Sequence, residues 1–228
     1  MKKANIANGT SRKRTAVALV MVATLAACSG GSDSPRAGGF LGQKSEPLEV
    51  YSPAQIFERG EFELEKNRAD DAAFYFGEIE RLYPYSEFAK RALIMQAFAF
   101  HRDEDYPNSR SAAQRFIDFY SDDDDAAYAQ YLLALSYYDQ IDEVGRDQGL
   151  TFQALQSLRE VIERYPNSEY AKSAVLKFDL AFDHLASKEM EIGRYYLRRD
   201  NYASSINRFR VVVEDFQTTS HTPEALHR

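Results

Sequence analysis

Few side chains in this sequence have the types and spacing that catalysis or metal binding requires. There is no glycine loop for phosphate, no nucleophile elbow and no paired Cys or His spacing for zinc. The aspartate run 122–125 lacks the alternation of an EF-hand calcium loop, and we expect it to be the solvated N-terminus of a helix that begins at Ala126. The four histidines are scattered along the chain, at His101, His184, His221 and His227. The sequence therefore predicts no catalytic residue, no metal site and no cofactor, and a protein that is not an enzyme.

One residue with chemistry of its own is Cys28, the single cysteine of the chain. The residues before it include five basic ones and no acidic one. A short apolar stretch over residues 15–25 lies between the basic residues and Cys28. This is the order of a secretory signal, and the apolar stretch falls short of the roughly 20 residues that a spanning helix needs. The segment Leu25-Ala26-Ala27-Cys28 resembles the lipobox of bacterial lipoproteins. That resemblance implies cleavage before Cys28 and acylation of its sulfur and amine, which gives stable membrane anchoring.

The residues after Cys28 indicate where the anchor leads. Ser29 stands where an inner-membrane retention signal of the enteric type would have Asp, so we expect sorting to the outer membrane, with the chain on its periplasmic face. The sequence up to Glu49 is rich in Gly and Ser, which is typical of a flexible tether. We therefore expect a signal peptide at 1–27, a lipidated N-terminus and tether at 28–49, and a folded domain at 50–228. With one cysteine, no disulfide can form within a monomer.

The charge balance limits the class of partner. Residues 1–28 carry five of the 28 basic residues and none of the 35 acidic ones, which leaves 23 basic against 35 acidic and a formal charge of −12. Such a charge repels nucleic acid and anionic headgroups. We expect protein partners with basic patches, no nucleic acid, and membrane attachment through the lipid alone.

The folded part has a helical period throughout and repeats itself. The segment Tyr83-Pro84-Tyr85-Ser86 and the segment Tyr165-Pro166-Asn167-Ser168 are each followed by Glu, an aromatic residue, Ala and Lys. Proline cannot continue a helix, while Ser is a good N-cap and Glu suits the first turn. Each segment therefore predicts one helix end and the next helix start. Weaker versions occur near residues 120 and 216, so the ends recur as in a helical-hairpin repeat.

These residues resemble the tetratricopeptide repeat, a helix-turn-helix unit of about 34 residues. The matching positions in residues 53–86 are Ile56, Gly60, Ala72, Phe76, Ile79 and Pro84, and those near the C-terminus are Gly193, Tyr196, Phe209 and Val212. Small residues let the two helices approach, and the aromatic residue fills the groove between them. We predict an all-α tetratricopeptide solenoid of about five repeats, the last one truncated after a helix start near Thr222.

Two regions depart from the plain repeat, and the aromatic residues need places. Residues 141–151 predict a loop between two helices, and residues 168–198 predict one unusually long helix. With 15 Tyr and 15 Phe, many aromatic side chains must be interior, and we expect Phe74 among them. The remainder suit a concave binding face for an extended peptide. On aromatic character alone we nominate Tyr51, Phe57 and Phe100 for this groove.

Lipobox, tether and hairpins together resemble the BamD family of outer-membrane assembly lipoproteins. The segments that carry the resemblance are residues 49–55, residues 115–117, the pair Arg146-Asp147, residues 164–170 and the pair Asn207-Arg208. Gln114 stands where the family often has Asp.

The resemblance implies a scaffold of the β-barrel assembly machine. Its N-terminal repeats would receive unfolded outer-membrane proteins, and its C-terminal repeats would bind a POTRA domain of BamA. Asn207 and Arg208 match the BamA-binding positions, with Arg208 pairing an acidic residue of the partner. Other Bam lipoproteins are further expected partners.

Two other classes of protein remain open on the sequence. One is a cell-envelope tetratricopeptide adaptor of the Tol and peptidoglycan coordination type, against which the lipobox and the missing heptads argue. The other is a lipoprotein enzyme, with its chemistry in a segment beyond residue 228.

Overall fold

The computed structural model describes residues 47–141 and 148–228, which fall in one compact unit. The predicted signal peptide, Cys28, Ser29, most of the predicted tether and the pair Arg146-Asp147 lie outside the described residues. Within the described ranges the regular structure is helical, without a strand. The elements are η1 (Leu48–Val50), α1 (Pro53–Glu65), α2 (Ala69–Leu82), α3 (Glu87–Arg102), α4 (Tyr106–Phe119), α5 (Ala126–Tyr138), α6 (Gly149–Arg164), α7 (Glu169–Leu197), α8 (Tyr202–Asp215) and α9 (Thr222–His227).

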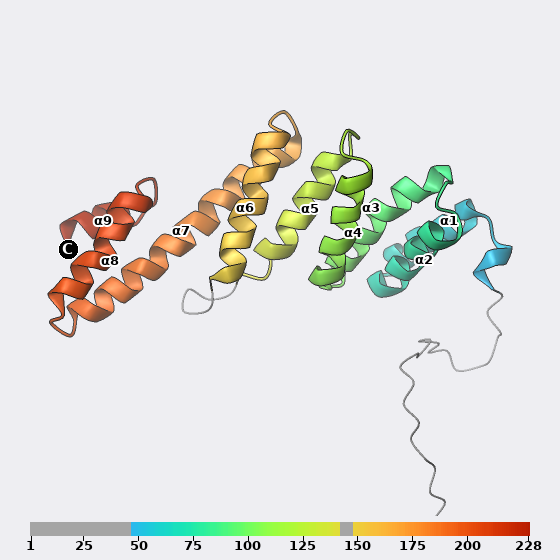
Figure 1. Cartoon of the computed structure of the whole chain (residues 1–228). Coiled ribbons are helices and arrows are strands. Elements are labelled where there is room, and N and C mark those ends of the chain that lie inside the picture. The colour runs from blue at the N-terminus through green and yellow to red at the C-terminus, as the bar shows by residue number, and fades with distance from the viewer. Residues whose placement is uncertain (1–46, 142–147) are drawn as a thin grey trace, which may run out of the picture. The chain divides into compact units, whose positions relative to one another are not determined.

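The helices form a series of stacked hairpins (Figure 1). Each helix from α1 to α9 packs against the next one along the chain. In addition, α1 contacts α3, α3 contacts α5 and α5 contacts α7. This arrangement is that of a tetratricopeptide solenoid, in which each unit buries its apolar face against its neighbours. The predicted fold class is confirmed: α1–α2, α3–α4, α5–α6 and α7–α8 are four hairpins, and α9 begins a further unit.

Close approach of the two helices in the first and last hairpins depends on glycine. A Cβ on Gly60 would lie 2.7 Å from the ring of Phe76, and one on Gly193 would lie 2.4 Å from the ring of Phe209. Both rings are buried, at 0% and 4% exposure. Each phenylalanine therefore occupies the volume that a side chain on the facing helix would need.

The two middle hairpins fill the same place with different volumes. At the equivalent positions Ala97 faces Ala113 within one buried cluster, and Ala134 packs with Leu158 in another. Where the first helix carries a methyl group, the second carries a side chain smaller than phenylalanine.

Three hairpins have a left-handed residue at the same position in the turn between their helices. Asn67, Glu104 and Asp200 have φ angles of 59°, 61° and 60°. The N–H of the residue that follows each of them donates to the carbonyl oxygen five positions back, as from Arg68 to Glu63 at 2.9 Å. This is the Schellman pattern, which satisfies carbonyl groups at a helix end and usually uses glycine.

The predicted helix boundaries at the proline segments are confirmed, with one difference in capping. The Ser168 side chain accepts a hydrogen bond from the N–H of Ala171 at 3.1 Å, as expected for an N-cap. Ser86 holds the equivalent position, but its side chain makes no capping bond. The N–H of Ala89 donates instead to the Ser86 carbonyl oxygen at 3.1 Å. This N–H is the one that the Ser86 hydroxyl would accept as an N-cap.

Most of the remaining expectations for the elements are also met. Helix α7 spans 29 residues without interruption, α5 begins at Ala126 after the aspartate run, and α9 begins at Thr222. The predicted loop at 141–151 holds the undescribed residues 142–147, and α6 begins at Gly149. The interior placement of Phe74 was wrong, because its side chain is 56% exposed. Phe74 lies five residues before the buried Ile79, which places the two on different faces of α2.

Candidate binding surface around Arg208

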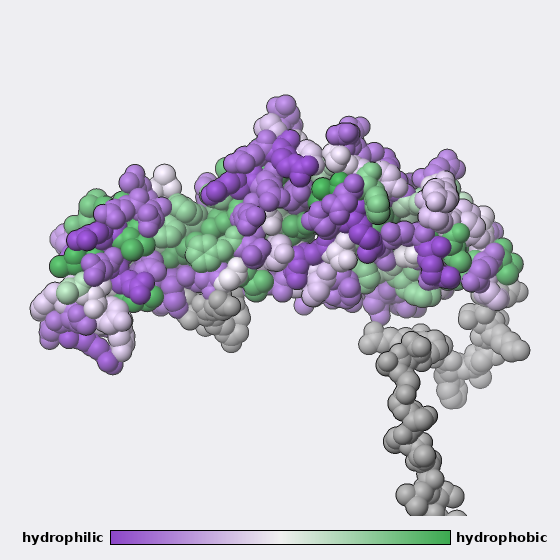
Figure 2. Space-filling view, in the orientation of Figure 1, coloured by the Kyte–Doolittle hydropathy of each residue, from purple (hydrophilic) through white to green (hydrophobic). Residues whose placement is uncertain are grey.

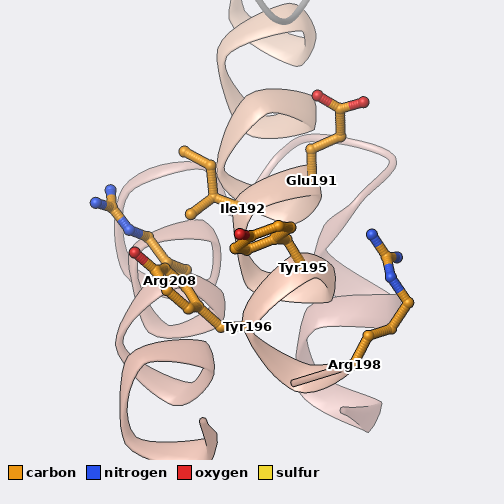
Figure 3. Close-up of a pocket in the computed structure, with 6 residues that line it drawn as sticks. All are labelled: Glu191, Ile192, Tyr195, Tyr196, Arg198 and Arg208. Carbon is orange, nitrogen blue, oxygen red and sulfur yellow. The ribbon is translucent and has the colours of Figure 1, made fainter. Parts of the chain in front are cut away.

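Two adjoining hollows lie on the surface that α7 and α8 form together. The larger has a volume of about 530 Å³ and the smaller about 280 Å³, and Tyr196 and Arg208 line both. In Figure 3 the Arg208 side chain lies beside Tyr196, while Glu191 and Arg198 flank Tyr195. We call this the Arg208 surface; its residues are Glu191, Ile192, Tyr195, Tyr196, Arg198, Ser204, Asn207, Arg208 and Val211.

The packing of α8 against α7 fixes the position of this surface. Besides the contact of Phe209 with Gly193, the Ser205 hydroxyl donates to the Gly193 carbonyl oxygen at 2.9 Å. Ser205 is buried, so this bond holds α8 close to α7 at one defined height. Asn207 and Arg208 follow on the next turn and are carried to the rim of the hollows.

Arg208 is held by an ion pair within the chain. Its Nη1 donates to both carboxylate oxygens of Glu189 on α7, at 2.9 and 3.3 Å. The Glu189 side chain is only 17% exposed, whereas that of Arg208 is 43% exposed. A guanidinium has five N–H donors, and among the described residues Nε and Nη2 of Arg208 have no acceptor. The bond to Glu189 therefore orients Arg208 and leaves one edge of it for an external carboxylate.

Helix α9 is fastened beside this surface by a second charge cluster. Arg194 of α7 donates from Nε to Glu224 at 2.9 Å and also from Nη2, and Arg228 donates to the same carboxylate at 2.6 Å. The hydrogen bonds from Arg194, and then from Arg228, lower the pKa of Glu224 to about 2, against the opposing effect of desolvation. Glu224 is thus ionised at any physiological pH.

The three residues nominated for a groove do not form one exposed surface. Phe57 is 3% exposed, and its ring contacts those of Phe76 and Phe88 at centroid distances of 5.2 and 5.6 Å. We therefore withdraw Phe57, because a core ring offers no surface to a peptide. Tyr51 is 36% exposed and Phe100 is partly buried against the same core. Their role in substrate binding stays a prediction.

The sequence missed the partner of Arg208. Glu189 lies 19 residues before Arg208, on another helix, and no short-range pattern marks it. In the described part of the chain, no cluster of three or more His, Cys, Asp or Glu side chains is placed to hold a metal ion. None of the described helices combines the length and apolarity that crossing a membrane requires.

Comparison with known proteins decides the family. A family model described as "Outer membrane lipoprotein" (YfiO) matches residues 50–228. The outer membrane protein assembly factor BamD of Caulobacter vibrioides is 42% identical over 214 residues, which cover 94% of this chain and 67% of that protein. This chain belongs to the BamD family. A BamD of Rickettsia prowazekii is 40% identical over 186 residues, covering 81% and 74% of the two chains. The BamD of Neisseria meningitidis serogroup A is 24% identical over 198 residues, 82% of this chain and 74% of its own.

The BamD match spans the described hairpins. It begins at residue 50, within η1, and runs through α9. Both helices that carry the Arg208 surface therefore lie inside the matched region. The predicted family is confirmed, whereas the roles of single residues stay predictions.

Proposed function

We propose that this chain is a lipid-anchored scaffold of the machinery that assembles β-barrel proteins in the outer membrane. Membership in the BamD family, whose relatives are named outer membrane protein assembly factors, supports this role. Stacked hairpins offer surface for recognition. The observation that carries the proposal is Arg208, an arginine oriented by Glu189 at the rim of two open hollows.

The Arg208 surface receives a POTRA domain of BamA. An acidic residue of the partner binds the Nε–Nη2 edge of Arg208, while Glu189 keeps the Nη1 edge. Tyr195, Tyr196 and Ile192 supply apolar contact around the charge, and Asn207 supplies an exposed amide. Aromatic residues and arginine are the types that dominate binding energy at protein interfaces.

The rest of the chain serves attachment and substrate binding. Acylated Cys28 anchors it, Ser29 permits sorting to the outer membrane, and residues 28–49 act as the tether. The N-terminal repeats receive unfolded outer-membrane proteins near Tyr51 and Phe100. Arg91 lies 4.7 Å from the centroid of the Phe57 ring and donates from Nη2 to Glu61 at 3.0 Å, so a carboxylate of the substrate would bind its remaining N–H groups.

A charge-swap series tests the contact with BamA. We expect Arg208→Glu to lose co-purification of BamA by about tenfold or more, since removing one member of a desolvated charge pair strands the other. Arg208→Glu also places two carboxylates together, so the double variant Glu189→Arg with Arg208→Glu restores the internal ion pair with reversed polarity. BamA binding should stay lost in the double variant while the helical circular-dichroism signal returns to that of the wild type.

Arg210→Glu is the matched control on the same helix, because Arg210 is exposed and lines neither hollow. It should retain BamA. Full recovery of BamA in the double variant would show that Arg208 acts only through the fold, and would refute the contact.

A further inference from the structure

Helix α7 is covered along only part of one face. Helix α8 runs beside its C-terminal half (Figure 1). There Phe209 packs at Gly193, and at the far end of α8 the ring of Phe216 contacts Phe182 at 4.9 Å. Steps of three and four residues continue the same face from Phe182 to Asp179 and Val175. Beyond Phe182, Val175 on this face is 41% exposed.

Comparison with the second hairpin shows what is missing there. Val175 and Asp179 follow Ser168 by the same numbers of residues as Leu93 and Ala97 follow Ser86. Leu93 and Ala97 are 3% and 0% exposed, since α4 packs on α3 at this height. The Ser109 hydroxyl of α4 donates to the Ala97 carbonyl oxygen at 2.9 Å. The N-terminal half of α7 therefore corresponds to the first helix of a hairpin, and no described helix takes the place of the second.

The uncovered face carries exposed apolar side chains around Asp179, with Lys172 four residues before Leu176 and Asp183 four residues after Asp179. Val175, Leu176 and Leu180 are 41%, 67% and 63% exposed. Figure 2 shows hydrophobic residues gathered over the stretch of α7 between α6 and the α8–α9 pair. Contiguous exposed apolar surface of this kind marks interaction sites in soluble proteins. Asp179 lies among these side chains and is itself exposed.

We infer that an amphipathic helix of another protein docks on Val175, Leu176, Asp179 and Leu180 and completes this unpaired hairpin. Its apolar residues would recur at three- and four-residue spacing, as in helix-in-groove recognition. A lysine or arginine would face Asp179. This charge complements the site and also suits the net charge of −12 beyond residue 28, 23 basic against 35 acidic residues. The inference does not depend on the role of Arg208.

Two other occupants fit less well. A lipid surface would have to bury the carboxylate of Asp179 between the leucines, which is costly without a partner. A second copy of this chain would bring the same negative balance to the site. A basic-rimmed helix meets neither obstacle.

The register suggests the probe. Helix α4 (Tyr106–Phe119, 14 residues) packs on the equivalent face of α3, so a stapled, fluorescently labelled peptide of that sequence is offered to the full chain in mild detergent. Fluorescence anisotropy should show saturable binding. Leu176→Glu should weaken it about tenfold. Leu226→Glu is the matched control, because Leu226 is 68% exposed against 67% for Leu176, and should change affinity by less than about twofold.

A second peptide tests the charge. Ala113 of α4 faces the Ala97 position, so Ala113→Lys in the peptide places an ammonium opposite Asp179. This peptide should bind more tightly than the first, and Asp179→Asn should abolish the difference.

Absence of saturable binding, or equal weakening by Leu226→Glu, would overturn the inference. A dimer in analytical ultracentrifugation that Leu176→Glu removes would also overturn the inference. So would binding of the non-acylated protein to anionic vesicles, if Leu176→Glu removes that binding. Those results would assign the face to a second copy or to lipid.

Discussion

At the scale of single residues, this protein places side chains where local preference argues against them. Glu104 adopts the left-handed conformation that favours glycine, whereas Asn67 and Asp200, which share this conformation, are of types that tolerate it better. The turn geometry is imposed by the hairpin, since both flanking helices are fixed by their cores. Because none of the three turns has glycine at the left-handed position, the sequence did not predict them.

Glu104 provides a direct test of that strain. Glu104 is exposed with φ of 61°, so Glu104→Gly relieves a left-handed β-carbon and should raise the free energy of unfolding by about 1 kcal/mol. Thermal denaturation followed by circular dichroism should show a Tm higher by about 3 °C. The control is Glu58→Gly in the exposed middle of α1, which should lower stability by about 1 kcal/mol. Equal destabilisation by both would show that the turn is unstrained.

At the scale of elements, periodicity predicted what local sequence determines and missed what distant residues determine. The proline-terminated helices, the long α7 and the start of α9 follow from spacing and from residues that stop or cap a helix. The burial of Phe57, the exposure of Phe74 and the pairing of Arg208 with Glu189 depend on which face meets a neighbour. Those faces are set by residues 19 or more positions away, and a local pattern does not contain them.

The attachment of α9 should depend on pH. The pKa of Glu224 is lowered from 4.5 to about 2, so its contribution to stability is present above about pH 4.5 and is lost as pH falls toward 2. We expect α9 to detach in this window, seen as a shift of the Ala225 methyl signal in NMR spectra. Glu224→Gln should show the detached signal already at pH 6 and no transition. A wild-type signal that stays unchanged down to pH 2 would contradict the fastening role.

At the scale of the whole molecule, the chain combines a proposed lipid anchor with a row of hairpins that differ in what they leave exposed. Tyr51 lies just before the first hairpin and Phe100 lies in the second, while the last hairpin carries the Arg208 surface beside α9. The first hairpin and the last hairpin belong to separate hydrophobic clusters, so binding sites on them can be occupied together. A scaffold with such sites raises the effective concentration of one partner near another.

The anchor is tested on the intact protein in cells. Because Cys28 is the single cysteine of the chain, Cys28→Ser should abolish metabolic labelling with palmitate and release the protein from the membrane fraction. Ser29→Asp should keep the label and move the protein to the inner-membrane fraction. Persistent membrane attachment of the unlabelled Cys28→Ser variant would refute attachment by lipid alone.

The pairing of side-chain volumes between the two helices of each hairpin has an evolutionary consequence. Gly60 with Phe76 and Gly193 with Phe209 leave no room for a methyl group, while Ala97 faces Ala113. A lineage that gains alanine at residue 60 or 193 must lose ring volume at the facing position to keep its packing. Among homologous chains, the residues at the two facing positions should therefore change together. The ring should be replaced by a smaller side chain before the glycine is replaced by alanine.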